Sequence, residues 1–380
     1  MLALISEFIE DKGEKAIRES FSPMSFRDRY LLGILTLALI LRLLDLSFPS
    51  HFPQPDEYFS LEAASQPSFL ETIRYVAGDT HPPLYFLLLR AWLRIFPPIP
   101  FSTKILSILF NVTNILFTYQ IALVWVDRKT ARLAAFVMAL SPWNIYWSHL
   151  ARNHQMLPPL FTLSSWSLLV WLRSDSKRFP LVYCLFTMLM VQTNYLAFFI
   201  LATHGVIVLW ECRGKIQRIF ILFAAQLTGI LSYIPFFPIL VRHIQEGPMN
   251  AGFSQHTVSP IYLFFHFIFF NLFTDNLGAL WYPPPSSIIL ILSGGTVIAL
   301  AGLKAVKRLR DPGFYLLLLV PITLTLVFAK IKGTTMAERY LAYAIGPFAI
   351  LFAAGLAEWI EQGRRYLFKR MEKSRPSLAQ

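Results

Sequence analysis

Long apolar runs recur along the chain between about residues 30 and 357, and short polar segments separate them. Each run is close to the roughly 20 residues that an α-helix needs to cross the hydrocarbon core of a bilayer. We therefore expect an all-α polytopic membrane protein. The runs predict about ten transmembrane helices, at 30–47, 103–125, 133–148, 155–172, 179–194, 196–210, 219–241, 286–303, 313–329 and 340–357.

Two further apolar stretches, at 82–98 and 259–274, fit this pattern less well. The first contains Arg90 and Arg94, and counting both stretches as spans would put several basic loops on the outer side of the membrane. We therefore interpret both stretches as interfacial or re-entrant helices.

Lysine and arginine are concentrated in the segments that this arrangement places on one side of the membrane. Those segments hold 24 of the 34 basic residues, and they are 1–29, 127–132, 173–178, 211–218, 304–310 and 358–380. The positive-inside rule assigns that side to the cytoplasm, so both termini are expected there. The long loops 48–102 and 242–285 then face outward, together with short turns near 149–154 and 330–339.

The chain accordingly divides into three parts. Residues 1–29 are expected to form a cytoplasmic leader that is retained rather than cleaved. Residues 30–357 form a single transmembrane domain, and residues 358–380 form a basic cytoplasmic tail. The predicted location is the inner (plasma) membrane, with multiple passes and the functional site on the extracytoplasmic side.

Composition agrees with this interpretation, because 55% of the residues are hydrophobic and only 15% are charged. Such a chain is too apolar for a soluble globular protein.

The net charge of +12 could suggest a nucleic-acid partner, but the basic residues stand between apolar runs rather than on one exposed face, so no nucleic-acid partner is predicted. The two cysteines, Cys184 and Cys212, indicate neither a disulfide framework nor a zinc site.

An acidic pair, Asp56 and Glu57, follows the first span by a few residues, at the height where a lipid headgroup would lie. The side chains of adjacent residues point about 100° apart around a helix axis, so the two carboxylates are not expected to share a role. Transfer from a phosphate-linked sugar needs one base for the acceptor hydroxyl and cations for the departing phosphate, and we assign the base to Asp56. On the residues alone, a helix N-cap at Asp56 with Glu57 in the first turn fits equally well. A glycosidase would need a second acid at a set separation, which the sequence does not offer.

The first outer loop ends with Asp79-Thr80-His81-Pro82-Pro83-Leu84-Tyr85 and leads towards Arg90 and Arg94. Paired prolines fix the start of a helix, but they lack the amide hydrogens that could bind an anion at that helix start. An anion bound there would therefore need a hydrogen bond from the His81 ring. The alternative role for His81 is to cap the turn. Arg90 and Arg94 lie one helical turn apart. They could hold a phosphate together or anchor an interfacial helix, and we favour the anchor.

Residues 141–154 are dense in aromatic and polar groups, and the aromatic rings fit an interfacial belt. His149 and His154 are five residues apart, which takes them off a common helical face, and no carboxylate stands with them, so no metal site is predicted. Arg152 is the best candidate here for an anionic ligand. Later in the chain, Glu338-Arg339-Tyr340 places another arginine at headgroup height.

The order of these motifs resembles that of the GT-C glycosyltransferases, over about residues 30–357. The motifs are Arg42 in the first span, Asp56-Glu57, His81-Pro82-Pro83-Leu84-Tyr85, Ser141-Pro142 through Ala151-Arg152, and Arg339-Tyr340. The chain looks most similar to the bacterial relatives of protein O-mannosyltransferases and lipid A aminoarabinose transferases, glycosyltransferase families 39 and 83. The resemblance implies the GT-C fold, with interfacial helices in the outer loops.

The resemblance also implies a reaction. A hexosyl or pentosyl unit would pass, with inversion, from a polyprenyl-phosphate donor to a lipid, glycan or protein acceptor at the outer face of the membrane. Asp56 would be the essential carboxylate and Glu57 the second acidic member, while Arg152 and Arg339 would contact the donor phosphate. The substrate-binding positions that the motifs imply are His81, Tyr85, Arg152, Arg339 and Tyr340.

One position departs from the pattern, because relatives commonly have Gln-Glu before Ala-Arg where this chain has His149-Leu150. The acidic contact that relatives have there is missing, which leaves open a changed substrate or weak activity. A divalent cation, the one cofactor that the resemblance suggests, stays open as well. The rival interpretation from another class is a transporter or flippase of lipid-linked sugar, which predicts charges buried in mid-span and paired broken helices. The third interpretation is a membrane scaffold without catalytic activity.

Overall fold

The computed structural model describes residues 28–45, 55–79, 81–174, 176–246, 297–298, 300–332 and 338–373, and none of these lies in a β-strand. The described part is almost entirely helical, as predicted. In chain order the helices are α3 (Arg29–Asp45), α4 (Pro55–Ser65), α5 (Phe69–Val76), α6 (Leu84–Ile95), α7 (Pro100–Trp125), α8 (Arg128–Leu140), α9 (Pro142–Ser148), η1 (Asn153–Gln155), α10 (Leu157–Arg173), α11 (Phe179–Val191), α12 (Ala197–Glu211), α13 (Ile216–Leu231), η2 (Ile234–Phe236), α14 (Phe237–Glu246), α17 (Pro312–Lys332), η4 (Glu338–Ala344) and α18 (Ile345–Lys373). Residues 297, 298 and 300–305 are helical as well.

Three helical segments in the described part are long and apolar enough to cross a membrane, namely Phe101–Trp125, Pro312–Ile331 and Tyr340–Phe368. A fourth arises if Ile216–Leu231 and Ile234–Val241 count as one span, although they are bent by 43°. All four coincide with predicted spans. The apolar helices α11 and α12 are shorter, so the number of ten spans stays a prediction. The stretch 259–274 and most of the predicted span 286–303 lie outside the described residues.

The predicted span 133–148 is wrong as a single helix, because the chain breaks between α8 and α9. Pro142 has no N–H and cannot donate to the carbonyl of Met138, four residues earlier. That carbonyl instead accepts from Asn144 Nδ2 at 3.0 Å and from Arg42 Nη2 at 3.4 Å. The break is therefore stabilised by side chains that replace the missing backbone bond.

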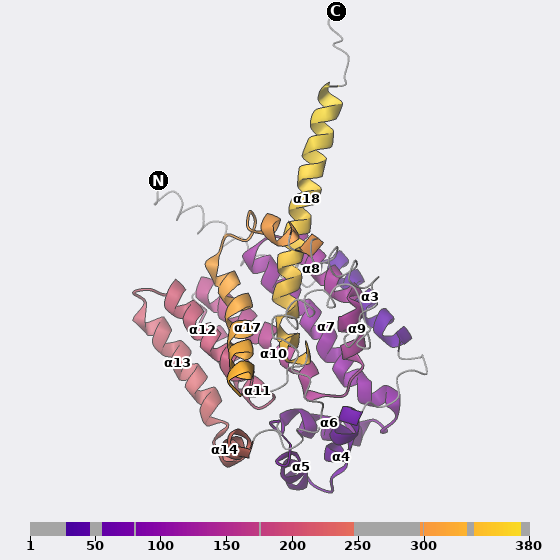
Figure 1. The fold of residues 1–380 in the computed structure, drawn as a ribbon, viewed down its shortest axis with the longest axis vertical. Coiled ribbons are helices and arrows are strands. Elements are labelled where there is room, and N and C mark those ends of the chain that lie inside the picture. The colour runs from indigo at the N-terminus through magenta and orange to yellow at the C-terminus, as the bar shows by residue number, and fades with distance from the viewer. Residues whose placement is uncertain are drawn as a thin grey trace, which may run out of the picture.

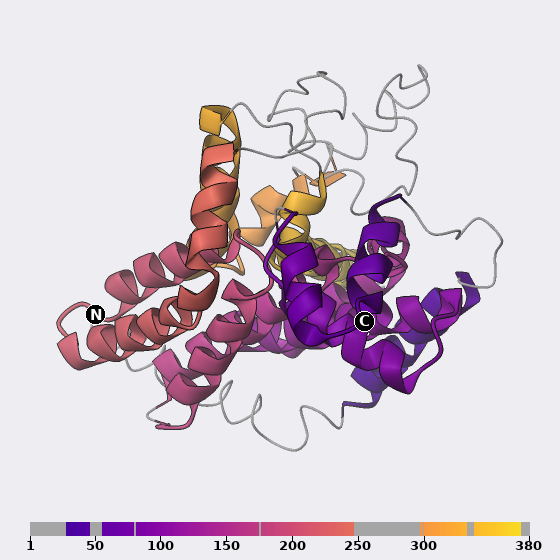
Figure 2. The same ribbon diagram turned by 90° about the horizontal axis from the view of Figure 1, so that it is seen from below.

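Helix α10 lies at the centre of the bundle. It packs against α7, α11 and α12, and α12 and α13 lie on one side of the molecule while α3 and α9 lie on the other (Figures 1 and 2). Helix α18 packs against α8. It also approaches the helical residues 300–305 so closely that a Cβ on Gly355 would collide with the backbone of Ala301. The missing side chain permits this contact.

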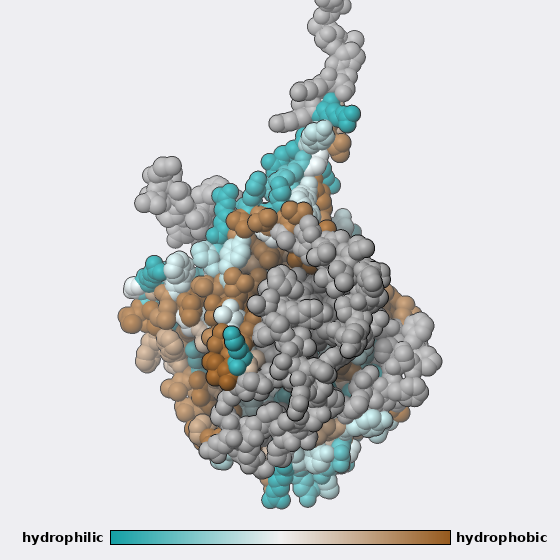
Figure 3. Space-filling view, viewed as in Figure 1, coloured by the Kyte–Doolittle hydropathy of each residue, from teal (hydrophilic) through white to brown (hydrophobic). Residues whose placement is uncertain are grey.

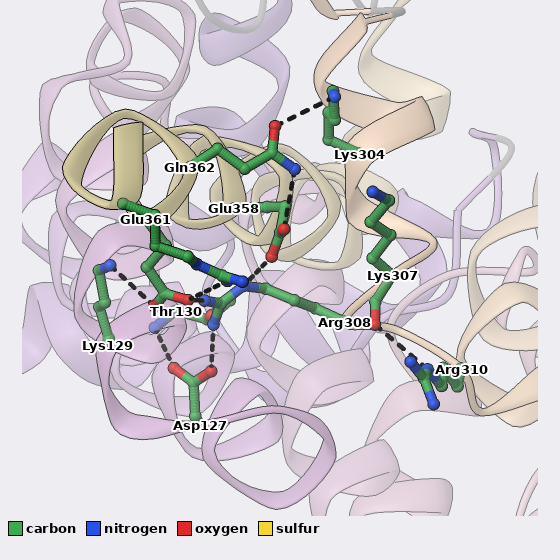
Figure 4. Close-up of polar contacts among 11 residues, drawn as sticks. Asp127, Lys129, Thr130, Lys304, Lys307, Arg308, Arg310, Glu358, Glu361 and Gln362 are labelled. Atoms are coloured by element: carbon green, nitrogen blue, oxygen red, sulfur yellow. Dashed lines mark hydrogen bonds and ion pairs between the residues drawn. The ribbon is translucent and has the colours of Figure 1, made fainter. Parts of the chain in front are cut away.

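Ion pairs join several segments that were predicted to be cytoplasmic. Arg308 pairs with Asp127 at 2.7 Å, with Glu358 at 3.3 Å and with Glu361, and Lys129 pairs with Glu361 at 3.1 Å (Figure 4). Two further pairs are Asp28 with Arg132 and Arg173 with Asp311. The charge pattern of the sequence thus predicted which segments gather at one end of the bundle.

Helices α4, α5 and α6 belong to the first predicted outer loop, and they lie together at the end of the molecule opposite the projecting part of α18 (Figure 1). Where described residues are visible in Figure 3, apolar ones predominate on the left flank of the body and more polar ones lie at its upper and lower ends. Helix α6 has 12 residues, too few to span a membrane. This agrees with the interfacial helix predicted at 82–98.

Candidate functional site

The acidic pair lies in the first turn of α4, which begins at Pro55. Asp56 is therefore inside the helix, and the N-cap alternative for it is wrong. Proline suits this place because the first helical N–H has no partner within the helix, and carboxylates in the first turn interact favourably with the helix dipole. The side chain of Asp56 lies outside the described part of the structure. That of Glu57 is described.

The Glu57 side chain leaves its own helix and contacts a distant turn. Its Oε1 accepts a hydrogen bond of 2.9 Å from the backbone N–H of Ala151, and the residue is fully buried. A charge-assisted bond of this kind is stronger than a neutral one, so it fixes the start of α4 against the segment that carries Arg152. The surroundings of Glu57 are therefore described, and a separate role for Asp56 stays a prediction.

Helix α4 is held at its other end by Arg90 of α6. The guanidinium donates to the carbonyls of Ala64, Gln66 and Pro67, and it lies 5.3 Å from the ring centre of Phe69. Neither of the roles considered for the Arg90 and Arg94 pair, phosphate binding or lipid anchoring, describes this contact. Arg94 is exposed, whereas Arg90 is buried and connects α4, α5 and α6.

Arg152 is 93% buried, yet its side chain is incompletely bonded. The Nε and Nη1 atoms have no hydrogen-bond partner among the described residues, and the guanidinium carbon lies 5.6 Å from the ring centre of Phe59 in α4. A buried guanidinium without a carboxylate partner is costly for a folded protein. Its unused donors would suit an anionic ligand.

Tyr85 is in the first turn of α6, and its hydroxyl lies near the charges of Glu57 and Arg152. Burial raises the pKa of its hydroxyl, the side chain of Ser107 lowers it, and the charges of Glu57 and Arg152 act in opposite directions, with a net pKa well above the ordinary value. The phenol therefore stays neutral and can donate a hydrogen bond. Ser107 Oγ also donates to the carbonyl of Leu150 at 2.7 Å, which ties α7 to the same turn.

Three rings from separate segments meet near this turn. His154 lies edge-on to His81, with ring centres 5.4 Å apart, and edge-on to Tyr340, with ring centres 6.0 Å apart. The neighbouring Asn153 has a buried Oδ1 without a hydrogen-bond partner among the described residues. Helix η4 packs against η1, which brings the backbone of Arg339 to this region, although its side chain lies outside the described part.

A buried polar network positions the turn, and the site prediction from the sequence did not include its asparagines. Arg42 Nε donates to Asn111 Oδ1 at 2.8 Å, and Asn111 Nδ2 donates to Asn144 Oδ1 at 2.7 Å. The backbone carbonyl of Arg42 lies 2.9 Å from His149 Nε2. The only signal in the sequence was that Asn111 and Asn144 interrupt apolar stretches. Their pairing across 33 residues could not be predicted from it.

The described side chains among the predicted site residues come together around the turn at 149–154. They are Glu57, His81, Tyr85, Arg152 and Tyr340. Within the described ranges, no group of three or more histidine, cysteine, aspartate or glutamate residues could hold a metal ion. The arrangement combines a buried guanidinium with two nitrogens unpaired among the described residues, a neutral phenol and an acidic helix start.

The family described as dolichyl-phosphate-mannose-protein mannosyltransferase matches residues 80–241. The crystal structure of ArnT from Cupriavidus metallidurans in the apo state superposes with a TM-score of 0.59 at 14% identity, and covers 86% of this chain and 59% of that one. ArnT bound to undecaprenyl phosphate gives the same score and identity, with 90% and 62% covered. The oligosaccharyltransferase of Archaeoglobus fulgidus gives 0.54 at 13% identity, with 93% and 53% covered. The chain has the GT-C fold.

The match to the mannosyltransferase family includes His81, Tyr85 and Arg152, and begins after the acidic pair. No curated protein matches the chain by sequence comparison. The chain spans about three fifths of the length of the ArnT structures and about half of the archaeal one. The comparisons thus confirm the predicted fold.

Proposed function

We propose that this GT-C chain is a membrane glycosyltransferase that uses a sugar linked to a polyprenyl phosphate. The sugar passes to a hydroxyl of a lipid, glycan or protein acceptor at the outer face of the membrane. The observation that carries the proposal is the buried Arg152, whose Nε and Nη1 have no partner among the described residues. The phosphodiester of the donor, and the phosphate monoester that leaves, both offer oxygens that such a guanidinium binds well.

The donor class is supported by the solved structures, because one ArnT structure of similar fold contains undecaprenyl phosphate. It is also supported by the position of the site. The helices α4, α5 and α6 lie at the end of the bundle opposite the Arg308 ion pairs, where the polar head of a long-chain lipid would meet a predicted outer surface.

In the proposed step, the acceptor oxygen bonds to the anomeric carbon while the bond from that carbon to the phosphate oxygen breaks. The acceptor proton passes to the Asp56 carboxylate, and polyprenyl phosphate leaves. Attack from the face opposite the phosphate inverts the anomeric centre. Arg152, with Arg339, neutralises charge that develops on the departing phosphate, which is the largest source of rate enhancement in such a transfer.

The other residues have supporting roles. Glu57 holds Arg152 in place through the Ala151 amide. The neutral Tyr85 hydroxyl can donate to the phosphate or to a sugar oxygen. His81, packed on His154 beside Tyr340, orients the donor or the acceptor.

The test uses purified full-length protein with candidate polyprenyl-phosphate sugars and a chromatographic assay for released polyprenyl phosphate. Asp56→Asn should lower the rate by about a hundredfold or more, the usual effect of losing a general base. Glu62→Gln is the matched control, because Glu62 is an exposed carboxylate on the same helix. Equal rates for Asp56→Asn and wild type would remove Asp56 from the role of base.

A lipid-sugar flippase is the second candidate. The observation in its favour is the broken helix pair Ile216–Leu231 and Ile234–Val241, bent by 43°. The buried Arg42 does not add support, because each nitrogen of its guanidinium already donates to a protein oxygen. Vesicles reconstituted with the protein distinguish the two functions: a flippase moves the labelled donor between leaflets with its sugar still attached.

A further inference from the structure

Helix α18 continues for about three turns past the point where it leaves the bundle. Its residues up to Gln362 are buried or half-buried, whereas every side chain described between Arg364 and Met371 is exposed, as is Gly363. The boundary coincides with the ion pairs of Arg308, which hold Glu361 (Figure 4). The helix is thus fixed to the bundle at one end and projects from it at the other (Figure 1).

The projecting part is amphipathic. Leu367, Phe368 and Met371 are 57%, 60% and 62% exposed, and at 100° per residue they fall within an arc of about 100°. Arg365 and Arg370 flank this arc on its two sides. Water is a poor environment for three large apolar side chains next to one another, so this face requires another covering.

Charge indicates what that covering is. The eight residues from Arg364 to Met371 include four basic residues and no acidic one. They overlap and continue the end of the helical segment Tyr340–Phe368, which is long and apolar enough to cross a membrane. Exposed basic residues of other segments, such as Lys307 and Arg310, lie at the same end of the bundle. A basic helix with an aromatic and aliphatic face is typical of segments that lie in the interface of an anionic membrane.

Gly363 gives the helix a place to bend. It stands at the boundary of the bundle, and a Cβ built there meets nothing within 4 Å. Glycine lowers helix stability and is a common site of kinks, so the segment beyond it can turn from the bundle axis towards the membrane plane. Arg364 falls inside the apolar arc, next to this bend, where its long side chain can reach the headgroups.

We infer that residues 363–371 form an interfacial helix that binds the anionic lipid headgroups of the bilayer that α18 crosses. Leu367, Phe368 and Met371 enter the boundary between headgroups and acyl chains, and Arg365 and Arg370 contact lipid phosphates on either side. This inference is independent of the glycosyltransferase proposal, because it concerns the opposite end of the molecule.

The test is spin-label accessibility in the full-length protein. Met371→Cys is labelled in a background with Cys184→Ala and Cys212→Ala, and the protein is placed in nanodiscs of phosphatidylcholine, with or without phosphatidylglycerol. The anionic discs should raise collisions of the label with oxygen and lower collisions with a water-soluble nickel chelate. A label at Lys307→Cys, an exposed position at the same end, should report water in both lipids.

A second variant separates lipid binding from simple proximity. A triple variant in which Arg364, Arg365 and Arg370 are each replaced by glutamine should lower the ratio of membrane-bound to aqueous label by roughly a hundredfold. Each arginine is expected to contribute a factor of about five to that ratio. Water exposure of Met371 in both lipids would overturn the inference. So would spin-spin broadening in discs that hold two copies, because a second chain would then cover the apolar face.

Discussion

The Glu57 carboxylate and the Ala151 amide are joined by a hydrogen bond of 2.9 Å across 94 residues of sequence. Both groups are buried, so neither has solvent as a substitute partner. The bond places the first turn of α4, with Asp56, beside the turn that carries Arg152. The proposed base and the proposed phosphate ligand are therefore positioned by one contact.

This contact predicts different effects for two substitutions of Glu57. Glu57→Gln keeps an oxygen that can accept from Ala151, whereas Glu57→Ala leaves the amide unpaired at a cost of about 1–3 kcal/mol. We expect Glu57→Ala to lower the unfolding temperature in detergent clearly more than Glu57→Gln does. Glu62→Ala is the control for loss of a carboxylate on the same helix. Equal unfolding temperatures for the two Glu57 variants would show that the bond contributes nothing.

Arg152 should have the opposite effect on stability. Its guanidinium is buried, and Nε and Nη1 have no hydrogen-bond partner within the described ranges. Arg152→Met therefore removes an unfavourable charge and should leave the unfolding temperature unchanged or higher. The same variant should lose the stabilisation that undecaprenyl phosphate gives to wild type, with affinity at least about tenfold lower. Thermal unfolding with and without that lipid measures both effects.

The control for this experiment is Arg310→Gln, which removes an exposed arginine at the other end of the bundle. It should keep the response to the lipid. A normal lipid response in Arg152→Met would place the phosphate elsewhere. A large loss of stability without lipid would show instead that Arg152 has a structural partner.

Arg90 gives a third prediction, because it holds the junction of α4 and α5 through three carbonyl oxygens. Arg90→Met should leave these buried acceptors unpaired and destabilise the protein by roughly 3 kcal/mol. Arg90→Lys, with a single ammonium in place of the fork, should recover only part of that loss. Arg94→Met, an exposed position on the same helix, should stay near wild type in the same unfolding experiment. A small effect at both positions would contradict the clamp.

The sequence predicted the ends of the bundle better than its interior. Positive charges in short segments identified the side on which Arg308 meets Glu361, because basic residues are costly within the hydrocarbon and collect beyond it. Periodicity could not reveal the break at Pro142, because apolar residues continue on both sides of it. The replacement donors come from Asn144 and from Arg42, which is 96 residues away from the Met138 carbonyl.

The candidate site was predicted as a set of residues but not as a geometry. Motif order brought Glu57, Tyr85 and Arg152 into one list, and the structure brings their side chains together. Arg90 was interpreted from its spacing to Arg94, yet spacing along a helix does not tell which side faces a neighbouring helix. That depends on the packing of α4 against α6, which involves residues about 25 positions apart.

The last prediction concerns pH and the polar end of α3. Burial would raise the pKa of Asp28, but hydrogen bonds from Arg132, Tyr119 and the Tyr30 amide outweigh it, so its pKa is lowered from the ordinary 3.8. A carboxyl group with a lower pKa in the folded state stabilises the fold above its unfolded pKa, and the effect disappears as pH falls through the folded value. Asp28→Asn should therefore be less stable than wild type at pH 7, by about 1–3 kcal/mol, and the difference should shrink below about pH 4. Unfolding temperatures of both proteins in detergent between pH 7 and pH 3 measure this difference in stability. A difference that stays constant over that range would mean that the charge of Asp28 is not what holds α3 to Arg132.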